Sequence, residues 1–414
     1  MHTSDTQQVR VVVLGAGYGG LLAAIRLAGK SRRADVTLIG ATDLFVERVR
    51  SHQYAAHQRV RQRPMADMLR GTRIKFIRGT VSSVDLEAHR VNVVGATTEQ
   101  HEQVAYEYLM LAVGSETNLD GVAGVREHAY SLNRSGARSV EGLRTLLPAL
   151  NDRHGRLVVV GGGPTGVEAA AEFAESFPGL HVTLTTRGNV LPLFPGKPRE
   201  HALKRLTQLG VEIRPQTKIT RVGAASLGTE GEDDLPFDAC LWCGGFSAPP
   251  LARQVGLKVN DRGQVLVNSN MRSISHPDVF ALGDAAYPAY EPAVPIRMAA
   301  FSAVAMGAHA ADSLANLLSD KPLRPFGFAH VGLGIALGRH DAVGFNTYPY
   351  GQPRMPVFTG WLGVHIREFF VDFLASLPTY ERLMPGFFFW LGKGRVTPAQ
   401  AVAISAPHVA DQAA

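Results

Sequence analysis

Residues 11–20 read VVVLGAGYGG, and the ten residues that follow, LLAAIRLAGK, are rich in helix formers. A β-branched run, a glycine turn and a helix, in that order, predict a strand, a phosphate-binding loop and the helix that begins beside it. Gly15 permits the sharp turn, Gly17 lets the backbone approach a pyrophosphate, and Gly20 lets the helix pack close to the strand. The free N–H groups at the helix N-terminus attract phosphate. This stretch therefore predicts a dinucleotide site.

The same pattern recurs in the middle of the chain. Residues 157–166 read LVVVGGGPTG and are followed by VEAAAEF, another helix-forming stretch. One glycine loop of this kind is weak evidence, whereas two in the correct strand–helix context indicate two dinucleotide sites in one chain. Two such sites suit a protein that passes electrons from one dinucleotide to another.

The end of each second strand indicates which dinucleotide binds. An acidic residue about 20 positions after the glycines commonly holds the ribose hydroxyls. After the predicted strand 35–39 the nearest carboxylate is Asp43, so either Asp43 or a backbone group takes this role, or the ribose is held loosely. After the predicted strand 181–185 comes Arg187, which favours the extra phosphate of NADP or a relaxed preference. The alternative role for Arg187 is an ordinary surface arginine.

Three further stretches complete a family resemblance. Residues 109–115 read LMLAVGS, residues 241–246 read LWCGGF, and residues 277–286 read PDVFALGDAA. With the two glycine loops, they make the chain resemble the two-dinucleotide flavoproteins, the pyridine nucleotide–disulphide oxidoreductases in the broad sense. Residues 45–54 lack the cysteine pair that the thiol-disulphide reductases carry there. The chain length, this stretch and the C-terminal region look most like the type II NADH dehydrogenases.

The resemblance implies an α/β fold with two Rossmann-like dinucleotide-binding domains and a C-terminal cap. The FAD domain is expected to be discontinuous, at residues 1–118 and 250–325. The NAD(P) domain, residues 119–249, is expected to be inserted into it, and residues 326–414 form the cap.

The resemblance also implies the cofactors and the residues that hold them. FAD is expected on the first unit, with its ribityl chain at Asp284, and NADH or NADPH on the second unit as electron donor. The expected cofactor-binding residues are Gly15, Ala16, Gly17, Tyr18, Gly19, Gly20, Gly114, Gly283, Asp284, Met298, Ala299, Gly161, Gly163, Pro164, Thr165, Gly166, Arg187, Gly244 and Gly245.

Three residues are candidates for catalysis. The family places Glu168 near the nicotinamide carboxamide and the flavin, and its alternative role is to complement the helix dipole. Arg48 and His52 are expected on a helix that passes along the flavin, where either can stabilise negative charge on the reduced ring or shuttle a proton. The alternative for both is a surface salt bridge.

The electron acceptor is less clearly indicated. Type II NADH dehydrogenases carry an AQxAxQ pattern beside the quinone and the flavin, whereas residues 300–305 read AFSAVA here. Phe301 and Ala305 therefore replace both glutamines and remove the amide donors expected for a quinone carbonyl. A quinone-like or other flat apolar acceptor is expected. The alternatives are a small iron–sulphur protein, a biosynthetic tailoring reaction, or a redox sensor without turnover.

The C-terminal region predicts an amphipathic helix. Residues 361–377 read WLGVHIREFFVDFLASL, with apolar residues at spacings of three and four, charged residues such as Arg367 elsewhere, and Pro378 as the predicted end. Residues 385–395, PGFFFWLGKGR, resemble an interfacial anchor. Type II dehydrogenases attach to one membrane leaflet through C-terminal helices. Packing on the body of the protein or a homodimer interface are the alternatives.

Composition excludes several classes of protein. With 45% hydrophobic residues the chain of 414 is not disordered, and it has no run of roughly 18 apolar residues. Lys and Arg number 42 against 36 Asp and Glu, and basic residues such as Arg50 and Arg63 are scattered. This pattern indicates a solvated surface and no nucleic-acid partner.

The cysteines and the N-terminus lead to two further expectations. Cys240 and Cys243 lie three apart in a predicted strand, so they point to opposite faces and are expected to be buried and structural rather than disulfide-bonded. No metal site is expected. The first ten residues lack the apolar core of a signal peptide. The protein is therefore expected in the cytoplasm, either free or peripheral at the cytoplasmic membrane face.

Overall fold

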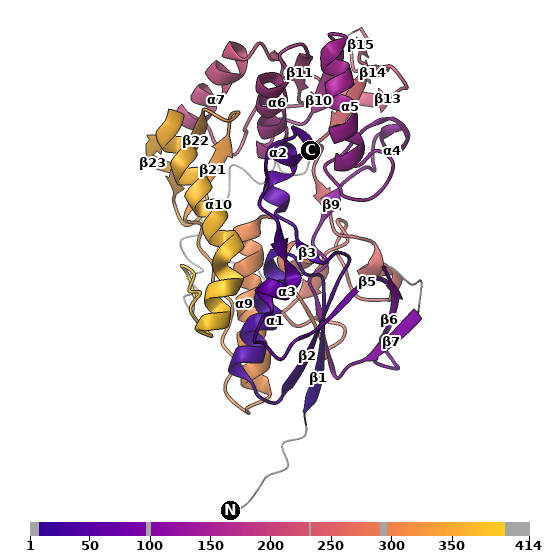
Figure 1. The fold of residues 1–414 in the computed structure, drawn as a ribbon, viewed down its shortest axis with the longest axis vertical. Coiled ribbons are helices and arrows are strands. Elements are labelled where there is room, and N and C mark those ends of the chain that lie inside the picture. Colours follow the sequence, from indigo (N-terminus) through magenta and orange to yellow (C-terminus); the bar gives the residue numbers. More distant parts are fainter. Residues whose placement is uncertain (1–7, 97–100, 232, 290–295, 394–414) are drawn as a thin grey trace, which may run out of the picture.

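The computed structural model describes residues 8–96, 101–231, 233–289 and 296–393. It has the predicted α/β fold, with two Rossmann-like units and a C-terminal cap (Figure 1). Most of the N-terminal segment and the last two residues of the anchor-like stretch lie outside the described residues.

A seven-stranded sheet forms the centre of the first unit. Its strands are β1 (Val9–Leu14), β2 (Ala34–Gly40), β5 (Lys75–Asp85), β6 (Arg90–Gly95), β7 (His101–Ala105), β8 (Tyr108–Leu111) and β19 (Val279–Ala281). The order is β19-β8-β1-β2-β5-β6-β7, parallel from β19 to β5 and antiparallel beyond it. The last four residues of β1 are almost wholly buried, which a strand covered on both faces requires.

Helix α1 (Tyr18–Lys30) packs against α9 (Ala300–Leu317) beside this sheet. The approach is close, because a Cβ atom on Gly307 would lie 2.4 Å from the carbonyl oxygen of Gly19. The glycine turn after β1 is thus held between its own strand and α9.

The second unit contains a four-stranded parallel sheet. Its strands are β10 (Arg156–Val160), β11 (His181–Thr185), β12 (Glu212–Arg214) and β16 (Ala239–Trp242), and its helices are α5 (Val140–Asp152), α6 (Pro164–Ser176) and α7 (Lys197–Gln208). The order is β12-β11-β10-β16. Three antiparallel strands, β13 (Ile219–Val222), β14 (Ser226–Thr229) and β15 (Leu235–Pro236), lie beside it.

The chain crosses between the two units twice, and the crossings lie side by side. Strand β9 (Glu116–Thr117) pairs antiparallel with β17 (Phe246–Ser247). The remaining short elements of the two units are β3 (Leu44–Phe45), β4 (Arg63–Pro64), β18 (Val265–Val267), β20 (Ala286–Pro288), α2 (Ser51–Ala55), α3 (Met65–Met68), α4 (Val125–His128), α8 (Leu251–Gln254), η1 (Arg48–Arg50) and η2 (Gly283–Ala285).

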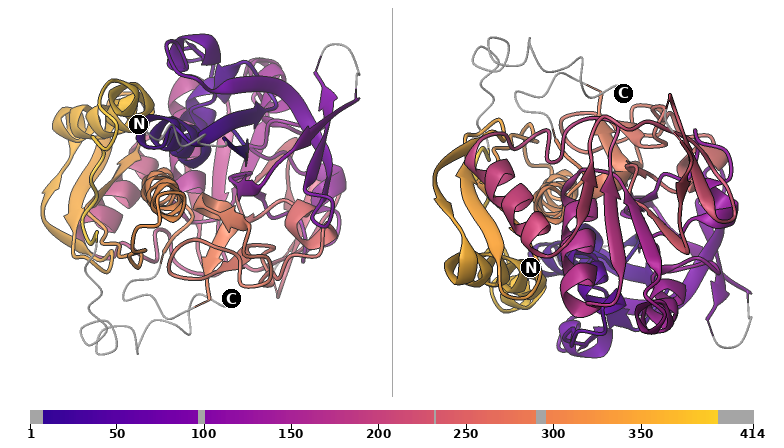
Figure 2. Two further views of the ribbon diagram at one scale, coloured as in Figure 1. Left: turned by 90° about the horizontal axis from the view of Figure 1, so that it is seen from below. Right: turned by 90° about the horizontal axis from the view of Figure 1, so that it is seen from above.

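The cap runs along one side of the molecule past both units (Figure 1), and it lies on one side in the views from both ends (Figure 2). It consists of the antiparallel strands β21 (Gly332–Ala336), β22 (Ala342–Thr347) and β23 (Pro353–Phe358) and the helix α10 (Gly360–Leu383). Ile335 and Val343 join the hydrophobic core of the second unit, whereas Phe388 and Trp390 join that of the first. The cap therefore fixes the two units against each other.

Helix α10 does not end before Pro378, so that prediction is wrong. The helix continues to Leu383 although proline removes one backbone hydrogen bond. Leu377 and Glu381, on either side of the proline, are wholly buried. Glu381 accepts hydrogen bonds from Arg26 of α1 and from the Phe388 N–H, so tertiary contacts hold the helix through the proline.

The faces of α10 also differ from the predicted pattern. Trp361 and Phe369 are 71% and 67% exposed, whereas Arg367 is only 3% exposed. The reason is a small residue on the inner face, since a Cβ on Gly363 would lie 2.3 Å from the Ala342 carbonyl oxygen. Close approach to β22 directs the aromatic side chains outward.

The scattered basic residues are not all on a solvated surface. The side chains of Arg50 and Arg63 are 11% and 9% exposed, and both bind the carboxylate of Glu47, at 3.0 and 2.9 Å. Burial of arginine is tolerated here because each guanidinium has a carboxylate partner.

Candidate active site

The first glycine loop is shaped by close contacts between backbone atoms. Gly15 has φ +106°, and a Cβ there would lie 2.3 Å from the Ala112 carbonyl oxygen. A Cβ on Gly20 would lie 1.9 Å from the carbonyl oxygen of Gly15. At Gly17, the residue that precedes α1, a Cβ would meet no described atom within 4 Å. The loop is therefore crowded on its inner side and open at the N-terminus of the helix.

The second loop repeats this geometry. Gly161 has φ +129°, and a Cβ there would lie 2.4 Å from the Cys243 carbonyl oxygen. A Cβ on Gly166 would lie 1.9 Å from the carbonyl oxygen of Gly161, and one on Gly163 would meet no described atom within 4 Å. Pro164 begins α6 and Thr165 follows it, both partly buried.

Both helices present backbone N–H groups of their first turn toward the open side of the loop. In α1 these begin at Tyr18, and in α6 they begin at Thr165, because Pro164 has no N–H group. The first N–H groups of a helix have no partner inside it, and the helix dipole places partial positive charge there. Each loop thus fits a pyrophosphate.

Asp284 lies in η2, just after β19 and near the first loop. It accepts a hydrogen bond of 2.7 Å from the Ser115 hydroxyl. Burial raises its pKa, and the Ser115 hydrogen bond, the charge of Arg48 and the nearby Ala299 N–H oppose that rise. Its other oxygen, Oδ1, is buried and has no hydrogen-bond partner among the described residues. An unpaired buried acceptor fits a ligand hydroxyl, as FAD supplies along its ribityl chain.

The other residues predicted to hold FAD lie at the same end of the first sheet as this carboxylate. Gly283 has φ +63° and packs against Ala303 of α9, and Gly114 has φ +72°. Met298 and Ala299 immediately precede α9. Ala16, Tyr18 and Gly19 belong to the first loop and the start of α1. The structure thus gathers all the residues predicted for FAD at one end of the first sheet.

Arg48 and His52 occupy different environments. Arg48, in η1, donates a hydrogen bond to the Ser115 carbonyl, so it lies beside Asp284. His52, in α2, is 3% exposed, and its Nε2 has no partner in the described part of the chain. Burial and the charges of Arg367 and Arg50 lower the pKa of His52 well below its ordinary value, so the imidazole is neutral.

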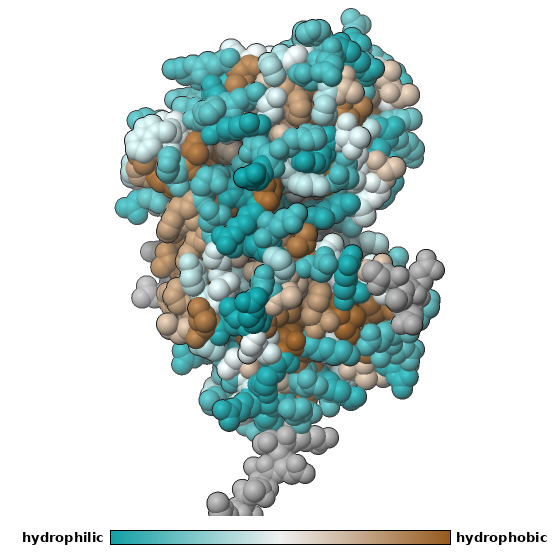
Figure 3. Space-filling view, viewed as in Figure 1, coloured by the Kyte–Doolittle hydropathy of each residue, from teal (hydrophilic) through white to brown (hydrophobic). Residues whose placement is uncertain are grey.

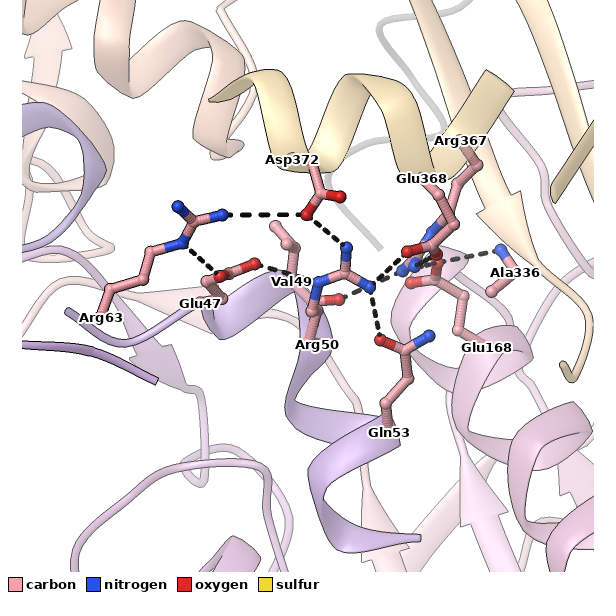
Figure 4. A network of polar contacts seen from close by, with 10 residues as sticks. All are labelled: Glu47, Val49, Arg50, Gln53, Arg63, Glu168, Ala336, Arg367, Glu368 and Asp372. Atoms are coloured by element: carbon pink, nitrogen blue, oxygen red, sulfur yellow. Dashed lines mark hydrogen bonds and ion pairs between the residues drawn. The ribbon is translucent and has the colours of Figure 1, made fainter. Parts of the chain in front are cut away.

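Glu168 is fixed by groups that lie far from it in the sequence. Its Oε1 accepts hydrogen bonds from the Ala336 N–H of β21, at 3.0 Å, and from Arg367 of α10, at 3.3 Å (Figure 4). Burial raises the pKa of Glu168, and the Arg367 charge and the Ala336 N–H oppose the rise. Arg367 was not a predicted site residue. The only signal in the sequence was a charged residue between the apolar positions of the helix, a feature that Glu368 and Asp372 share.

The other predicted residues flank the second loop. Arg187 is exposed and follows Thr186, whose hydroxyl lies 2.7 Å from where a Cβ on Gly162 would be. Gly244 and Gly245 lie between β16 and β17, where Gly245 has φ +111°. Asp43, the candidate for the first ribose, is exposed and pairs with Arg78 at 3.4 Å.

The cysteines are free, as predicted. Cys240 is buried in β16 and Cys243 is partly buried just after it. Loss of solvent around the thiols raises the pKa of both, that of Cys243 to about 12. Neither thiol is therefore suited to nucleophilic or redox chemistry.

Aromatic residues lie where the family pattern would place an amide. The centroid of the Phe301 ring lies 5.8 Å from that of the Phe328 ring and 6.4 Å from that of the Phe388 ring. Ala305 is wholly buried in α9. The start of α9 is therefore apolar, and the partly buried Phe301 packs against the buried rings of Phe328 and Phe388.

Comparison with known proteins agrees with this arrangement. The sequence profile of the pyridine nucleotide-disulphide oxidoreductases matches residues 9–307. The chain is 26% identical to a demethylphylloquinone reductase of Synechocystis, over 81% of this chain and 86% of that protein. It is also 26% identical to a type II NADH:quinone oxidoreductase of Staphylococcus haemolyticus, over 81% of this chain and 89% of that protein.

Solved structures share the fold. NDH2 from Plasmodium falciparum, in complex with NADH, superposes with a TM-score of 0.75 at 16% identity and covers 92% of this chain and 99% of its own. The sulfide:quinone oxidoreductase of Aquifex aeolicus gives a TM-score of 0.71 at 19% identity, over 92% and 95%.

Proposed function

Because the chain belongs to the pyridine nucleotide-disulphide oxidoreductase family, we propose that it is an FAD-dependent enzyme that oxidises NADH or NADPH and reduces a quinone. The observation that carries this proposal is the pair of glycine loops with the same steric pattern and an open helix N-terminus. The names of the relatives support the donor and the class of acceptor.

The first unit, residues 1–118 and 250–325, is the proposed FAD domain. The N–H groups that begin α1 hold the pyrophosphate, and the unpaired Oδ1 of Asp284 accepts a ribityl hydroxyl. FAD, when bound, supplies the carrier that takes hydride from the reduced nicotinamide and passes electrons to the acceptor. Arg48 places a positive charge beside Asp284, where it stabilises negative charge on a bound cofactor.

The second unit, residues 119–249, is the proposed NAD(P) domain. The N–H groups of Thr165 and Gly166, which follow Pro164 in the first turn of α6, hold the dinucleotide pyrophosphate, and Arg187 lies on the side where an adenosine ribose would be expected. Glu168 accepts a hydrogen bond from the carboxamide. His52 is neutral and buried with an unpaired Nε2, so its proposed part is to offer that nitrogen to a hydrogen bond from a bound cofactor rather than to supply charge.

The proposed acceptor is a quinone held by apolar contact. Phe301, which is partly buried and packs on the buried rings of Phe328 and Phe388, offers apolar contact to a flat ring but no amide donor to its carbonyl oxygens. A quinone with extended aromatic surface therefore suits this side better than one that depends on hydrogen bonds.

The exposed face of α10 is the proposed contact with the cytoplasmic side of a membrane. Figure 3 shows apolar side chains gathered over this helix at the left edge of the molecule. The exposed large hydrophobic residues of α10 and of the segment just after it are Trp361, Leu362, Phe369, Phe370, Tyr380, Leu383, Met384, Phe387, Phe389 and Leu391. Aromatic residues of this kind favour the membrane interface. No helix in the described ranges has the length and apolar character needed to span a membrane.

Anaerobic stopped-flow mixing tests the proposal. The FAD-loaded protein is mixed with NADH or NADPH, and the loss of flavin absorbance reports reduction. A second mixing step then adds a naphthoquinone, a benzoquinone or a small iron–sulphur protein. Fast reoxidation by the naphthoquinone supports the proposal. Reoxidation by the iron–sulphur protein alone would replace it with an electron-transfer reductase, and absence of reduction by either nucleotide would refute it.

Sedimentation with anionic lipid vesicles tests the membrane contact. We expect the wild-type protein to sediment with the vesicles and a variant with Trp361→Ser, Phe369→Ser and Phe370→Ser to remain in solution. Light scattering without lipid measures the molar mass and tests the alternative. A wild-type dimer that the same triple variant dissociates would show that a second copy covers this face.

A further inference from the structure

Arg367 lies where the cap and both dinucleotide units meet. Its guanidinium donates through Nη2 to Glu168 of the second unit and, at 3.4 Å, to the Val49 carbonyl of the first. Its Nη1 donates to Glu368 at 2.6 Å. One side chain of α10 therefore contacts both units at once (Figure 4).

The stem of Arg367 is held in place by β21. A Cβ on Gly334 would lie 2.7 Å from the Cγ of Arg367, so the strand passes directly against the side chain. Ala336 of the same strand donates its N–H to the oxygen of Glu168 that Arg367 also contacts. The direction of the guanidinium and that of the carboxylate are thus set by one strand.

The other charged groups nearby have other partners. Arg50 of η1 binds Glu47, Glu368 and Asp372, and His52 of α2 is buried and neutral. Glu368, beside Arg367 on α10, is negative and opposes the charge of Glu168. In the described ranges, Arg367 is thus the cation that pairs with Glu168.

We propose that Arg367 is a positioning residue that fixes the orientation and the negative charge of the Glu168 carboxylate for the nicotinamide carboxamide. This inference rests on the proposed function, in which NAD(P)H binds at the second loop. Because Arg367 belongs to the helix that exposes Trp361 and Phe369 on its other side, the nicotinamide side is complete only when α10 is seated on both units.

The test measures binding rather than turnover. The FAD-loaded full chain is titrated calorimetrically with 1,4,5,6-tetrahydro-NAD, an analogue of NADH that transfers no hydride, over a series of pH values. In the wild type, binding weakens as the pH falls and Glu168 takes up a proton. In Arg367→Met, the midpoint of this change moves to higher pH, and the affinity at neutral pH falls by about tenfold, because a charged hydrogen-bonding partner is lost.

Matched variants separate positioning from general stability. Arg367→Lys restores most of the affinity because it keeps the charge. Arg382→Met removes another arginine of α10, one that donates to the Arg70 carbonyl, and leaves the midpoint unchanged. Glu168→Gln should show no pH midpoint in binding, because the titrating carboxyl group is gone. Adding Arg367→Met to Glu168→Gln should lower the affinity for the analogue little further. If Arg367→Met is unstable, Arg367→Gln removes the charge but keeps a polar amide donor and allows the same comparison.

The outcomes distinguish this inference from the proposed function. A midpoint that Arg367→Met leaves in place, or a loss of affinity equally large in the Glu168→Gln background, overturns the positioning role alone. A wild-type protein that does not bind the analogue at any pH removes the proposed function and this inference together.

Discussion

A Cβ atom on Gly166 would lie 1.9 Å from the carbonyl oxygen of Gly161, and Gly20 stands in the same relation to Gly15. Both are approaches of backbone to backbone, so no side-chain rotation can relieve them. The same relation in two loops far apart in the sequence shows one structural solution used twice.

Gly166→Ala should therefore destabilise the second unit. Displacing a packed backbone costs about 2 kcal/mol or more, and the change affects the free energy of unfolding whether or not a nucleotide is present. Urea unfolding monitored by circular dichroism measures it. A variant as stable as the wild type would contradict the described approach of the two backbones.

Gly163→Ala should weaken nucleotide binding without changing stability. Gly163 has φ −74°, which alanine adopts freely, and its Cβ would point into open space at the N-terminus of α6. We expect unchanged stability and at least tenfold weaker binding of NADH, because the methyl group occupies the place of the pyrophosphate. Gly17→Ala in the first loop is the matched control and should weaken retention of FAD instead.

These loops were predictable from sequence because their signals are local. The run of apolar residues, the glycine spacing and the helix that follows all act within about 20 residues. The position of Asp284 was predictable from the family pattern, although its unpaired Oδ1 required the structure.

Other features were not predictable because they depend on distant parts of the chain. Glu168 and Arg367 are 199 residues apart, and nothing in either segment indicates the other. Pro378 is a local signal to end a helix, but burial of Leu377 and Glu381 overrides it. The apolar spacing of α10 indicated a helix correctly but not which face is inward, because Gly363 determines that face.

Asp284→Ala should lose FAD. The carboxylate offers an unpaired buried acceptor, and its loss should weaken flavin binding by at least tenfold, since a hydrogen bond to a charged group contributes about 1.5–3 kcal/mol. Flavin absorbance per polypeptide after gel filtration measures retention. Ser115→Ala, which removes only the 2.7 Å hydrogen bond to the other oxygen, should lose less. A fully yellow Asp284→Ala protein would remove this residue from the site.

Arg187→Ala tests the preference between nucleotides. The side chain is exposed, so its removal should not alter stability. If it pairs with the 2′-phosphate, the kcat/KM for NADPH should fall by about tenfold while that for NADH changes little. Steady-state rates with both donors give the ratio. An equal loss with both donors would indicate a different role.

The two cysteines should be dispensable for electron transfer. Burial raises the pKa of Cys243 to about 12 and that of Cys240 further, so neither is a thiolate at mildly alkaline pH. A chromogenic disulfide reagent should react with neither thiol in the folded protein and with both in denaturant. Cys240→Ala with Cys243→Ala should keep quinone reduction, whereas complete loss of flavin reduction in a folded double variant would contradict this prediction.

Asp312 of α9 should make stability depend on pH in the acid range. Burial alone would raise its pKa, but the hydrogen bonds and charge of Arg26, and those of Lys30, hold it well below its usual range. Such a carboxylate stabilises the folded state above its unfolded pKa of about 3.9, and this stabilisation is lost as the pH falls toward the folded value.

At neutral pH, Asp312→Asn should be less stable by about 3 kcal/mol, because Arg26 is 1% exposed and loses a bidentate partner. This gap, the difference in unfolding free energy between the wild type and Asp312→Asn, should narrow below about pH 4. Unfolding free energies in urea over a pH series measure the gap. Asp67→Asn, in an exposed pair with Arg70, is the control and should show no gap. A gap that stays constant into the acid range would mean that Asp312 acts through packing rather than through its charge.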